Sequence, residues 1–285
     1  MSCGSVRIRD IGLVLLAGLL TAASPGAAET DEGAEGTGLS LFPAQRRIVA
    51  PLLADPLETQ TRIRFGVQHH GPTLLDVTFG DNLVLGRLEM AGDQAMDLSV
   101  RGLITARFAV NEESFPLQAA DFVGGLAWGY QRGPDRFEAM LFHQSSHLGD
   151  EPLDFGDRDR IDFSRDSLRV LWSRRFGDLR VYLAPIVDLD PGPRDTNRRM
   201  RLQWGGEYYF DCLGQPCYAA ANAETIEAND WNVNVTGQVG WFLTRRTDHP
   251  FAPRVFLEVF TGHSVYGQFW NESETNFTIG FGSSW

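Results

Sequence analysis

The chain has 285 residues, 43% of them hydrophobic, and a formal net charge of −12. It contains no lysine, so every fixed positive charge on its side chains belongs to an arginine. This acidic balance excludes nucleic acid as a partner, because phosphate backbones bind basic surfaces. Beyond the N-terminal region no stretch reaches the roughly 18 consecutive apolar residues of a membrane-spanning helix. The length suits one large all-β domain.

The first residues have the features of a secretory signal peptide. Arg7 and Arg9 precede an apolar run at 11–23, and small residues follow, with cleavage expected after Ala28. The run has the length of a signal core and is short for a retained membrane anchor, which is the alternative. We therefore predict a signal peptide at 1–28 and an exported protein.

Residues 29–61 precede the main domain. The acidic, glycine-rich residues 29–38 predict a disordered lead-in, because they hold too little apolar surface to form a core. Residues 41–58 contain three prolines, which forbid a long helix. We interpret this part as an ordered periplasmic segment that closes one end of the domain formed by residues 62–285.

From Arg62 onward the dominant pattern is alternation with a period of two residues. Met200, Leu202, Trp204 and Phe210, for example, alternate with mainly polar neighbours. Such a strand has one apolar and one polar face. In a soluble sandwich the apolar face would form the core, whereas in an outer-membrane barrel it would face lipid and the polar face would line the lumen.

Three features favour the barrel. The chain is expected to be exported, and Trp231 and Trp241 share one face of a single predicted strand. Ten strand residues tilted at about 40° rise roughly 25 Å, which matches the lipid-facing band between aromatic girdles. At the C-terminus Phe277, Ile279 and Trp285 share one face and resemble the recognition signal of bacterial outer-membrane barrels. That resemblance implies the barrel-assembly machinery as a partner and the outer membrane as the location.

We therefore predict a closed antiparallel transmembrane β-barrel of the outer-membrane type. The alternation gives twelve strands, an even number, as single-chain bacterial barrels require. The predicted strands are 62–70, 74–88, 95–110, 121–131, 135–145, 160–175, 178–188, 200–210, 217–226, 231–243, 254–263 and 275–285.

The strand count also predicts the orientation. If the last strand ends in the periplasm, the short turns fall on the periplasmic side and the longer connections fall outside, as in known barrels. The short turns are 132–134, 176–177 and 211–216, and the longer connections are 146–159, 189–199 and 264–274.

Two cysteines remain in the exported chain, Cys212 and Cys217. An even pair in an oxidising compartment predicts a disulfide across a tight turn. A metal site would need more ligands than this stretch offers.

The stretch LFHQSSHLGDE at 141–151 is the candidate functional site. His143 and Ser145 have the parity of the apolar residue Leu141, so they should project outward at the outer-leaflet interface. Residues two apart on a strand lie about 6.6–6.8 Å apart at Cα, so His143 can reach Ser145. Asp162, with outward parity on the next strand, could hold the imidazole. This arrangement predicts Ser145 as a nucleophile, His143 as its base and Asp162 as the orienting residue.

Two other interpretations of the same stretch remain open. His143 and Ser145 could form a structural pair, hydrogen-bonded within the outer loops. His143 and His147 could instead bind a metal, because they also share one face of the strand.

The stretch resembles the outer-membrane phospholipase A family, which consists of twelve-stranded barrels. Members carry His-Gln-Ser-Asn-Gly with the His and Ser outward and an Asn on the next strand, and the match implies base His143 and nucleophile Ser145. Here Ser146 and His147 replace Asn-Gly, and the third member would be Asp162 or Ser164. The resemblance also implies calcium, whose oxygen ligands could come from a segment that is otherwise a solvated loop. The acidic residues of that segment are Asp150, Glu151, Asp154, Asp157 and Asp159.

A broader resemblance covers nearly the whole mature chain. The stretches LFP…PLLADP at 41–56, HQSSHLGDE at 143–151, DWN at 230–232 and GHS…GQF at 262–269 are similar, in this order, to a bacterial family, domain of unknown function 1207, of exported proteins. This resemblance implies the fold and not a reaction.

A second polar cluster lies at 261–270. Its His263 has outward parity, and the stretch is similar to the His-x-Ser-Asn of lipid A deacylases, with different spacing. Loop packing is the alternative. Its strand lies nearly across the barrel from His143, so one outward-facing site cannot use both histidines.

Two functions follow as hypotheses. The first is an outer-membrane acyl hydrolase acting on outer-leaflet lipid, and the second is a non-catalytic pore or structural surface barrel. In both cases an arginine–carboxylate lumen is expected, and such a lumen should be plugged. The residues expected to line it are Arg101, Arg107, Arg136, Glu138, Arg201 and Glu207. The oligomeric state stays open.

Overall fold

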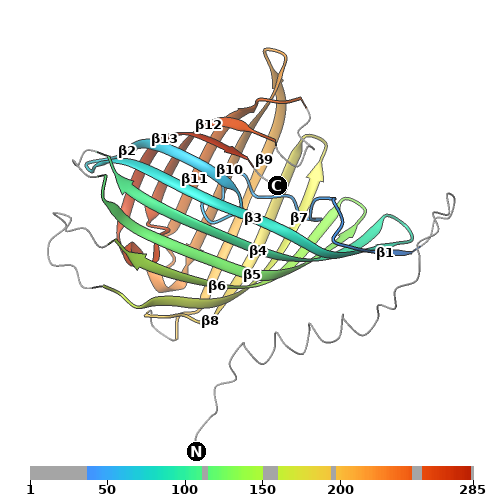
Figure 1. The fold of residues 1–285 in the computed structure, drawn as a ribbon, viewed down its shortest axis with the longest axis horizontal. Coiled ribbons are helices and arrows are strands. Elements are labelled where there is room, and N and C mark those ends of the chain that lie inside the picture. The colour runs from blue at the N-terminus through green and yellow to red at the C-terminus, as the bar shows by residue number, and fades with distance from the viewer. Residues whose placement is uncertain (1–36, 111–114, 150–159, 194–196, 246–251, 284–285) are drawn as a thin grey trace, which may run out of the picture. The chain divides into compact units, whose positions relative to one another are not determined.

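The computed structural model describes residues 37–110, 115–149, 160–193, 197–245 and 252–283 (Figure 1). The predicted signal peptide, the acidic residues 150–159 and the C-terminal Trp285 lie outside this part of the chain. Among the described residues no helix is both long and apolar enough to cross a bilayer.

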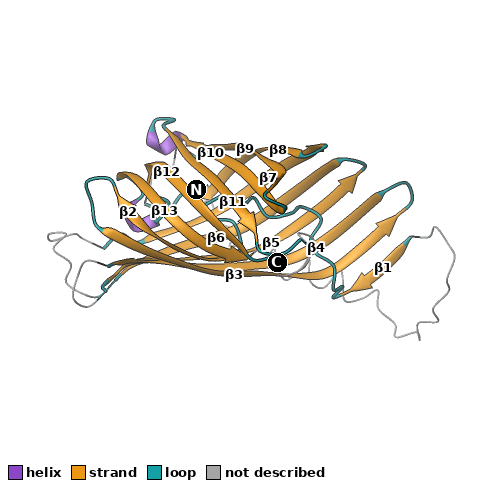
Figure 2. Cartoon of the chain, turned by 90° about the horizontal axis from the view of Figure 1, so that it is seen from above, coloured by secondary structure: helices purple, strands orange, loops and turns teal. Residues whose placement is uncertain are grey.

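Twelve antiparallel strands, β2 to β13, form a closed barrel (Figures 1 and 2). Each strand pairs with its sequence neighbours, and the barrel closes where β13 pairs with β2. The strands are β2 (Thr61–Gln68), β3 (Thr73–Met90), β4 (Gln94–Ala109), β5 (Leu117–Arg132), β6 (Asp135–Leu148), β7 (Phe163–Phe176), β8 (Leu179–Asp190), β9 (Met200–Cys212), β10 (Gln215–Ile226), β11 (Val233–Phe242), β12 (Arg254–His263) and β13 (Ser273–Ser283).

Two kinds of short element complete the described fold. An additional strand, β1 (Gly38–Leu41), pairs with the part of β3 that extends beyond β2. It begins where the sequence predicts the end of a disordered lead-in. Two 3₁₀ turns, η1 (Glu227–Asn229) and η2 (Gly267–Phe269), lie in connections between strands.

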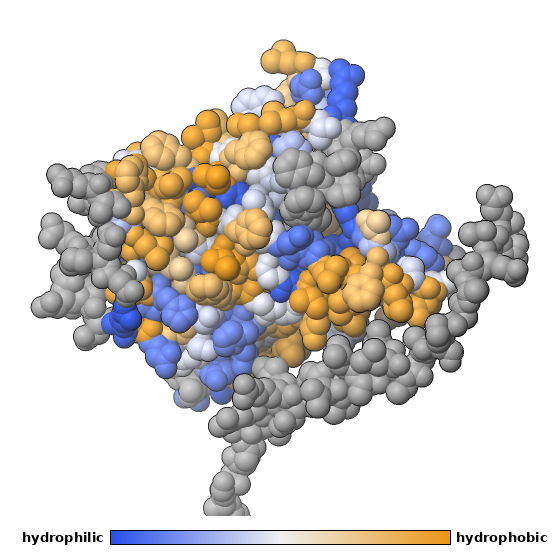
Figure 3. All heavy atoms as spheres, in the orientation of Figure 1, coloured by the Kyte–Doolittle hydropathy of each residue, from blue (hydrophilic) through white to orange (hydrophobic). Residues whose placement is uncertain are grey.

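Alternate residues of each strand form the outer and the inner face of the barrel wall. Outward positions are apolar, and large hydrophobic side chains are exposed on almost every strand (Figure 3). Inward positions are polar and buried, which is the reverse of a soluble protein and suits a wall surrounded by lipid. Of the predicted lumen residues, Arg101, Arg107, Glu138, Arg201 and Glu207 are each at most 4% exposed.

Every predicted strand overlaps one observed strand, and the predicted bounds of β12 are the observed ones. The largest difference in bounds is at β5, which begins at Leu117 and not at Asp121. Another difference is at β11, which begins at Val233 and not at Trp231. Asp230 and Trp231 have φ angles of 53° and 61°, in the left-handed region, so they belong to a turn. Trp231 and Trp241 are both exposed, but they are not on one continuous strand.

The two ends of the barrel differ. The turn end carries the tight connections at 133–134, 177–178 and 213–214 and one longer connection, 243–253, whereas the loop end carries 149–162 and 264–272. At the turn end Leu213 and Gly214 have positive φ angles of 52° and 76°, as a type I′ hairpin turn requires. The predicted disulfide between Cys212 and Cys217 is present in the structure and joins the strands beside this turn.

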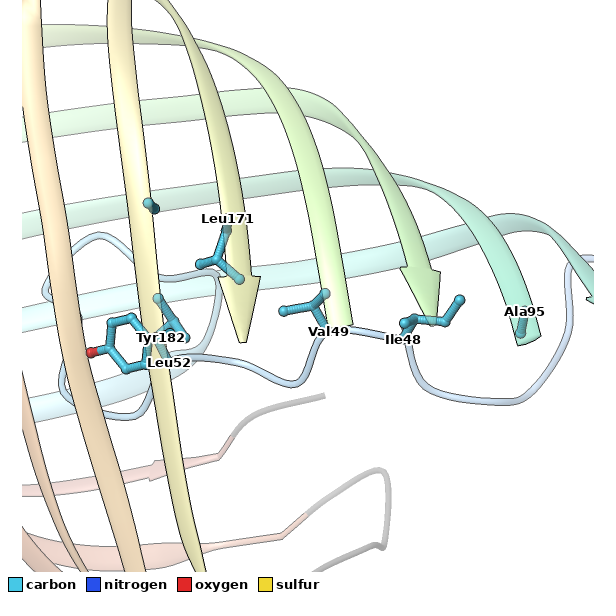
Figure 4. Packing of buried hydrophobic residues seen from close by; sticks show 7 residues of the cluster. Ile48, Val49, Leu52, Ala95, Leu171 and Tyr182 are labelled. Carbon is cyan, nitrogen blue, oxygen red and sulfur yellow. The ribbon is translucent and has the colours of Figure 1, made fainter. Parts of the chain in front are cut away.

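Residues 42–60, here called the inner segment, enter the barrel at the turn end, and most of them from Arg47 onward are buried. The hydrophobic residues Ile48, Val49 and Leu52 pack against Leu171 and Tyr182 of the wall (Figure 4). The segment follows β1 and leads into β2, so it closes the turn end from within.

Charged side chains secure the inner segment. Glu58 bonds Arg47 at 2.7 Å and accepts from the backbone N–H of Leu52 at 3.0 Å. Glu207 of the wall accepts from the N–H of Leu53 at 2.8 Å, and Arg180 donates to the carbonyl oxygens of the two residues at 50–51. These bonds compensate backbone groups that would otherwise be buried without partners.

Residues 264–272, here called the cap segment, close part of the loop end. Tyr266 is fully buried and lies under the guanidinium of Arg107, 4.6 Å from the ring centre. The N–H of Gly267 donates to Asp121 at 2.9 Å, and Gln268 donates to the carbonyl oxygen of Ser146 at 2.9 Å. Both ends of the lumen therefore hold ordered protein.

Candidate functional site

The stretch at 143–147 divides between the two sides of the wall. His143 and His147 are exposed and Ser145 is half-buried on the outer side, whereas Gln144 and Ser146 are buried on the lumen side. This is the orientation that the alternation predicts. A polar motif on one strand thus serves two separate environments.

On the outer side His143 contacts Asp166 of β7. The two residues lie directly opposite each other in the ladder, and Nδ1 of His143 is 2.8 Å from Oδ1 of Asp166. An ionised carboxylate can only accept, so Nδ1 carries the hydrogen of the neutral ring and Nε2 keeps a free lone pair. The His143 side chain is 51% exposed, and its free nitrogen is therefore available to an external molecule.

The residue that contacts His143 is not the one that the sequence predicts to orient it. The prediction named Asp162, but the register places Ser164 opposite Ser145 and Asp166 opposite His143. Asp162 precedes β7, is exposed, and makes no contact with His143 in the described structure. Asp166 has the outward parity of Leu168, so the sequence alone indicates that it faces outward. Parity could not choose between Asp162, Ser164 and Asp166, because all three share it.

Ser145 lies on the same face as His143, two residues further along β6. No hydrogen bond joins the two side chains in the described structure. Ser145 faces Phe122 on β5 and Ser164 on β7. The structure therefore brings His143, Ser145 and Asp166 onto one small area of the outer wall without completing a hydrogen-bonded chain.

The outer wall beside this area lacks a side chain on the β5 side and is apolar toward the turn end. The partner of His143 on β5 is Gly124, and a Cβ there would meet only a backbone oxygen at 3.9 Å. In the next row toward the turn end Leu126, Leu141 and Leu168 lie side by side. The imidazole is thus reachable from the bilayer side.

The lumen half of the motif is structural. Gln144 donates to Asp121 at 2.7 Å and accepts from Arg165 at 2.6 Å. Ser146 hydrogen-bonds Asp121 and accepts from the N–H of Gln268 in the cap segment. Gln144 and Ser146 therefore hold the cap segment to the wall.

The structure does not test the predicted calcium ligands, because they lie outside the described residues. Within them no group of three or more His, Cys, Asp or Glu side chains could hold a metal ion. Asp150, Glu151 and Asp157 lie outside the described residues, as do Asp154 and Asp159. His147 packs edge-on against Phe122, with ring centres 5.6 Å apart.

The second polar cluster, at 261–270, packs the loop end. The N–H of His263 donates to Asn234 at 2.8 Å, and the residues after it form the cap segment. Ser264 is buried and its hydroxyl accepts from the N–H of Tyr266 at 3.4 Å. These contacts fit the loop-packing interpretation.

Comparison with known proteins finds one family that matches this chain and several solved barrels that are similar to it in fold. A family described as "Protein of unknown function (DUF1207)" matches residues 21–285. Among curated proteins none matches this chain.

Several solved structures share the fold. The outer membrane phospholipase of Salmonella typhi, solved as a dimer with bound calcium, aligns with a TM-score of 0.58 and 14% identity over 86% of this chain and 92% of that chain. Outer membrane phospholipase A of Escherichia coli aligns with a TM-score of 0.56 and 15% identity over 82% and 95% of the two chains. The porin KdgM aligns more loosely, with a TM-score of 0.41 and 11% identity over 79% and 99%.

At these identities the likeness is one of fold alone. A closed barrel with an apolar outer wall, alike in fold to outer-membrane proteins, belongs in the bacterial outer membrane.

Proposed function

We propose that this protein, which belongs to the DUF1207 family of proteins of unknown function, hydrolyses acyl esters of outer-leaflet lipid. The observation that carries the proposal is the His143–Asp166 pair beside Ser145 on the outer wall of a membrane barrel. A histidine oriented by a carboxylate, with a hydroxyl on the same face, is the arrangement of an activated serine nucleophile. The loop end faces outward in this proposal, so the three residues lie near the ester groups of the outer leaflet.

The reaction would proceed in two steps. Ser145 Oγ attacks the ester carbonyl carbon while Nε2 of His143 takes the hydroxyl proton. The bond from Oγ to the acyl carbon forms, the bond to the leaving alcohol breaks, and His143 returns the proton to that alcohol. Water then cleaves the acyl-serine with His143 again as the base, which releases a fatty acid and restores Ser145.

Asp166 is a positioning residue in this scheme. It fixes the tautomer with the hydrogen on Nδ1 and stabilises the imidazolium that forms during each step. Ser145 must turn its hydroxyl toward Nε2 before reaction, since the two are not hydrogen-bonded in this structure. Catalytic hydrogen bonds are often long without substrate and tighten when it binds.

Two outer membrane phospholipases share the fold, and a structure of the Escherichia coli protein is described as an active-site mutant in which an asparagine is replaced by alanine. The present chain has an aspartate, Asp166, as the partner of its histidine. The proposal therefore rests on the geometry of this chain, and fold likeness adds only that such a barrel wall can carry esterase chemistry.

Calcium is part of the proposal as a cofactor. Its oxygen ligands would come from Asp150, Glu151 and Asp157, and when bound it would stabilise negative charge on the ester oxygen. We expect EDTA to abolish lipid hydrolysis and added Ca²⁺ to restore it. Activity that resists EDTA would remove calcium from the proposal and leave the roles of Ser145 and His143 standing.

The decisive test is Ser145→Ala in the full-length protein reconstituted with phospholipid. We expect fatty-acid release to fall on the order of 10³-fold or more, because the nucleophile is lost. Ser273→Ala is the matched control, since Ser273 is an exposed serine at the loop end of β13, opposite His263 and away from His143. Hydrolysis by the Ser145→Ala barrel at the wild-type rate would refute the proposal.

The non-enzymatic alternative has one observation in its favour. Gln144 and Ser146 already give the polar motif a structural role, and Ser145 and His143 share no hydrogen bond. If it holds, Ser145→Ala and wild type release fatty acid equally slowly, and the barrel stays heat-modifiable in both.

A further inference from the structure

The lumen contains a partly enclosed space between the inner segment and the barrel wall. It is lined by Asp55 and Glu58 of that segment and by side chains of β5 to β10, and its volume is about 40 Å³. A cavity of that volume holds about three water molecules. Apolar side chains form part of its wall, namely Val123, Met140, Phe142 and Ile186.

Polar atoms without hydrogen-bond partners gather around this cavity. They are Nε and Nη1 of Arg165, Nε of Arg169 and Oε1 of Gln203. The three residues line the cavity, and each is at most 8% exposed. Buried groups of this kind are normally paired, so they need a water molecule or an ion as a partner.

Arg165 is the buried cation without a carboxylate partner in this part of the lumen. Its single side-chain hydrogen bond goes to Gln144, at 2.6 Å, and no carboxylate lies within salt-bridge distance in the described structure. The neighbouring guanidiniums differ: Arg169 pairs with Glu138 at 3.0 Å, and Arg201 pairs with Asp188 at 3.0 Å.

The carboxylates near Arg165 are already engaged. Asp188 accepts from Ser167 and Arg201, and Glu224 accepts from Arg201. Asp121 accepts from Gln144, Ser146 and the N–H of the cap segment. None of them can turn to Arg165 without leaving another buried donor unpaired, which costs free energy.

We propose that this cavity binds a small monovalent anion against Arg165. Burial of an unpaired charge is expensive, and an anion removes that cost where a neutral water molecule does not. The partly apolar wall favours an anion that loses its hydration readily. The volume limits the ligand to a halide or a carboxylate of one or two carbons.

The site is distinct from the lipid-facing residues. Arg165 and Phe142 point into the lumen, whereas His143 and Asp166, which follow them in the chain, point outward. The proposed anion site is therefore independent of the proposed hydrolysis, and the two can be tested separately.

The first test compares thermal unfolding of the full-length barrel in detergent with sodium bromide, sodium acetate and sodium gluconate at equal ionic strength. Gluconate is too large for the cavity and serves as the reference. We expect the midpoint of the wild type to rise by a few degrees with bromide, and the effect to saturate, because a bound ligand stabilises the folded state. A rise with acetate as well extends the ligand class to small carboxylates.

Arg165→Met should abolish the bromide-specific rise, because it removes the charge and keeps most of the side-chain volume. Arg174→Met is the matched control, since Arg174 is 40% exposed at the turn end and pairs with Asp135. If Arg165→Met keeps the bromide response, or the wild type shows none, the proposal fails.

A second measurement does not depend on any variant folding. Wild-type crystals grown in sodium bromide should show an anomalous peak in the lumen against the Arg165 guanidinium. Density for water alone at that position would overturn the proposal.

Discussion

The contact between His143 and Asp166 is a surface ion pair or hydrogen bond, with side chains 51% and 26% exposed. Ionisable side chains on a lipid-facing surface are costly, and those that occur there commonly have a function. A histidine and an aspartate on a wall that otherwise faces lipid therefore need another explanation than stability. One explanation is that Asp166 orients the imidazole of His143 for a reaction. A catalytic role and a structural role of Asp166 can be separated by experiment.

Replacement of Asp166 should affect hydrolysis and not folding. We expect Asp166→Asn to lower kcat by on the order of 10²-fold or more, because an amide no longer enforces the tautomer with the hydrogen on Nδ1. Asp162→Asn, at the position predicted from sequence, should keep the wild-type rate. The assay is fatty-acid release from mixed micelles, with heat-modifiability as the check on folding. Equal losses in both variants would contradict the assignment of Asp166.

At the scale of strands, β5 leaves the side chain of His143 on β6 accessible. Gly124 on β5 has no side chain to cover the imidazole, and a Cβ there would meet only a backbone oxygen at 3.9 Å. The barrel should therefore accept a larger residue at position 124, but that residue would block the approach of a substrate to His143.

Gly124→Val should lower lipid hydrolysis at least several-fold, mainly through a raised KM, because the added methyl groups occupy space beside His143. Gly237→Val is the control: Gly237 lies on β11, and a Cβ there would meet nothing within 4 Å. Both variants should unfold at the wild-type temperature. A Gly124→Val protein with unchanged kinetics would show that substrate does not approach across β5.

The inner segment is the second element with a testable property. Burial disfavours the charged form of Glu58, but Arg47, Arg169 and Arg101 outweigh burial and lower its pKa to about 2. A carboxyl group with a lowered pKa stabilises the folded state fully above its ordinary pKa of about 4.3, and that contribution is lost as the pH falls toward 2.

Acid should therefore loosen the inner segment between about pH 4.5 and 2. We expect the unfolding midpoint of the wild type to fall across this window and Glu58→Gln, already less stable at neutral pH, to show a flatter dependence. Cleavage of residues 42–60 by pepsin, an acid-active protease, gives an independent measure. A wild-type midpoint that is constant over the window would exclude this role of Glu58.

At the scale of the whole molecule, the lumen is occupied from both ends. The inner segment closes the turn end, and the cap segment packs on Asp121 and Ser146 at the loop end. The arginines and carboxylates between them form many ion pairs, among them Arg101 with Glu138 and Arg107 with Asp76. Such an interior holds a barrel together and leaves little room for solutes.

Purified protein in planar bilayers should therefore show no steady conductance at neutral pH. The reason is steric, because the inner segment and the cap segment occupy the two ends of the described lumen. A stable open conductance in the range of small porins would contradict a closed lumen and favour the pore function.

Alternation alone was enough to predict which side of the wall each residue faces, because a strand alternates with a period of two wherever it lies. That rule placed His143 and Ser145 outward, placed Glu138 and Arg101 in the lumen, and located twelve strands. The disulfide followed from an even pair of cysteines in an exported chain. Which residues meet across strands could be seen only in the folded barrel. Register depends on how two separate segments pair, and a shift of two residues would replace Asp166 by Ser164 as the partner of His143. The filling of the lumen by residues 42–60 and 264–272 was likewise decided by packing, because both segments lack a periodic pattern and take their shape from contacts with the barrel around them.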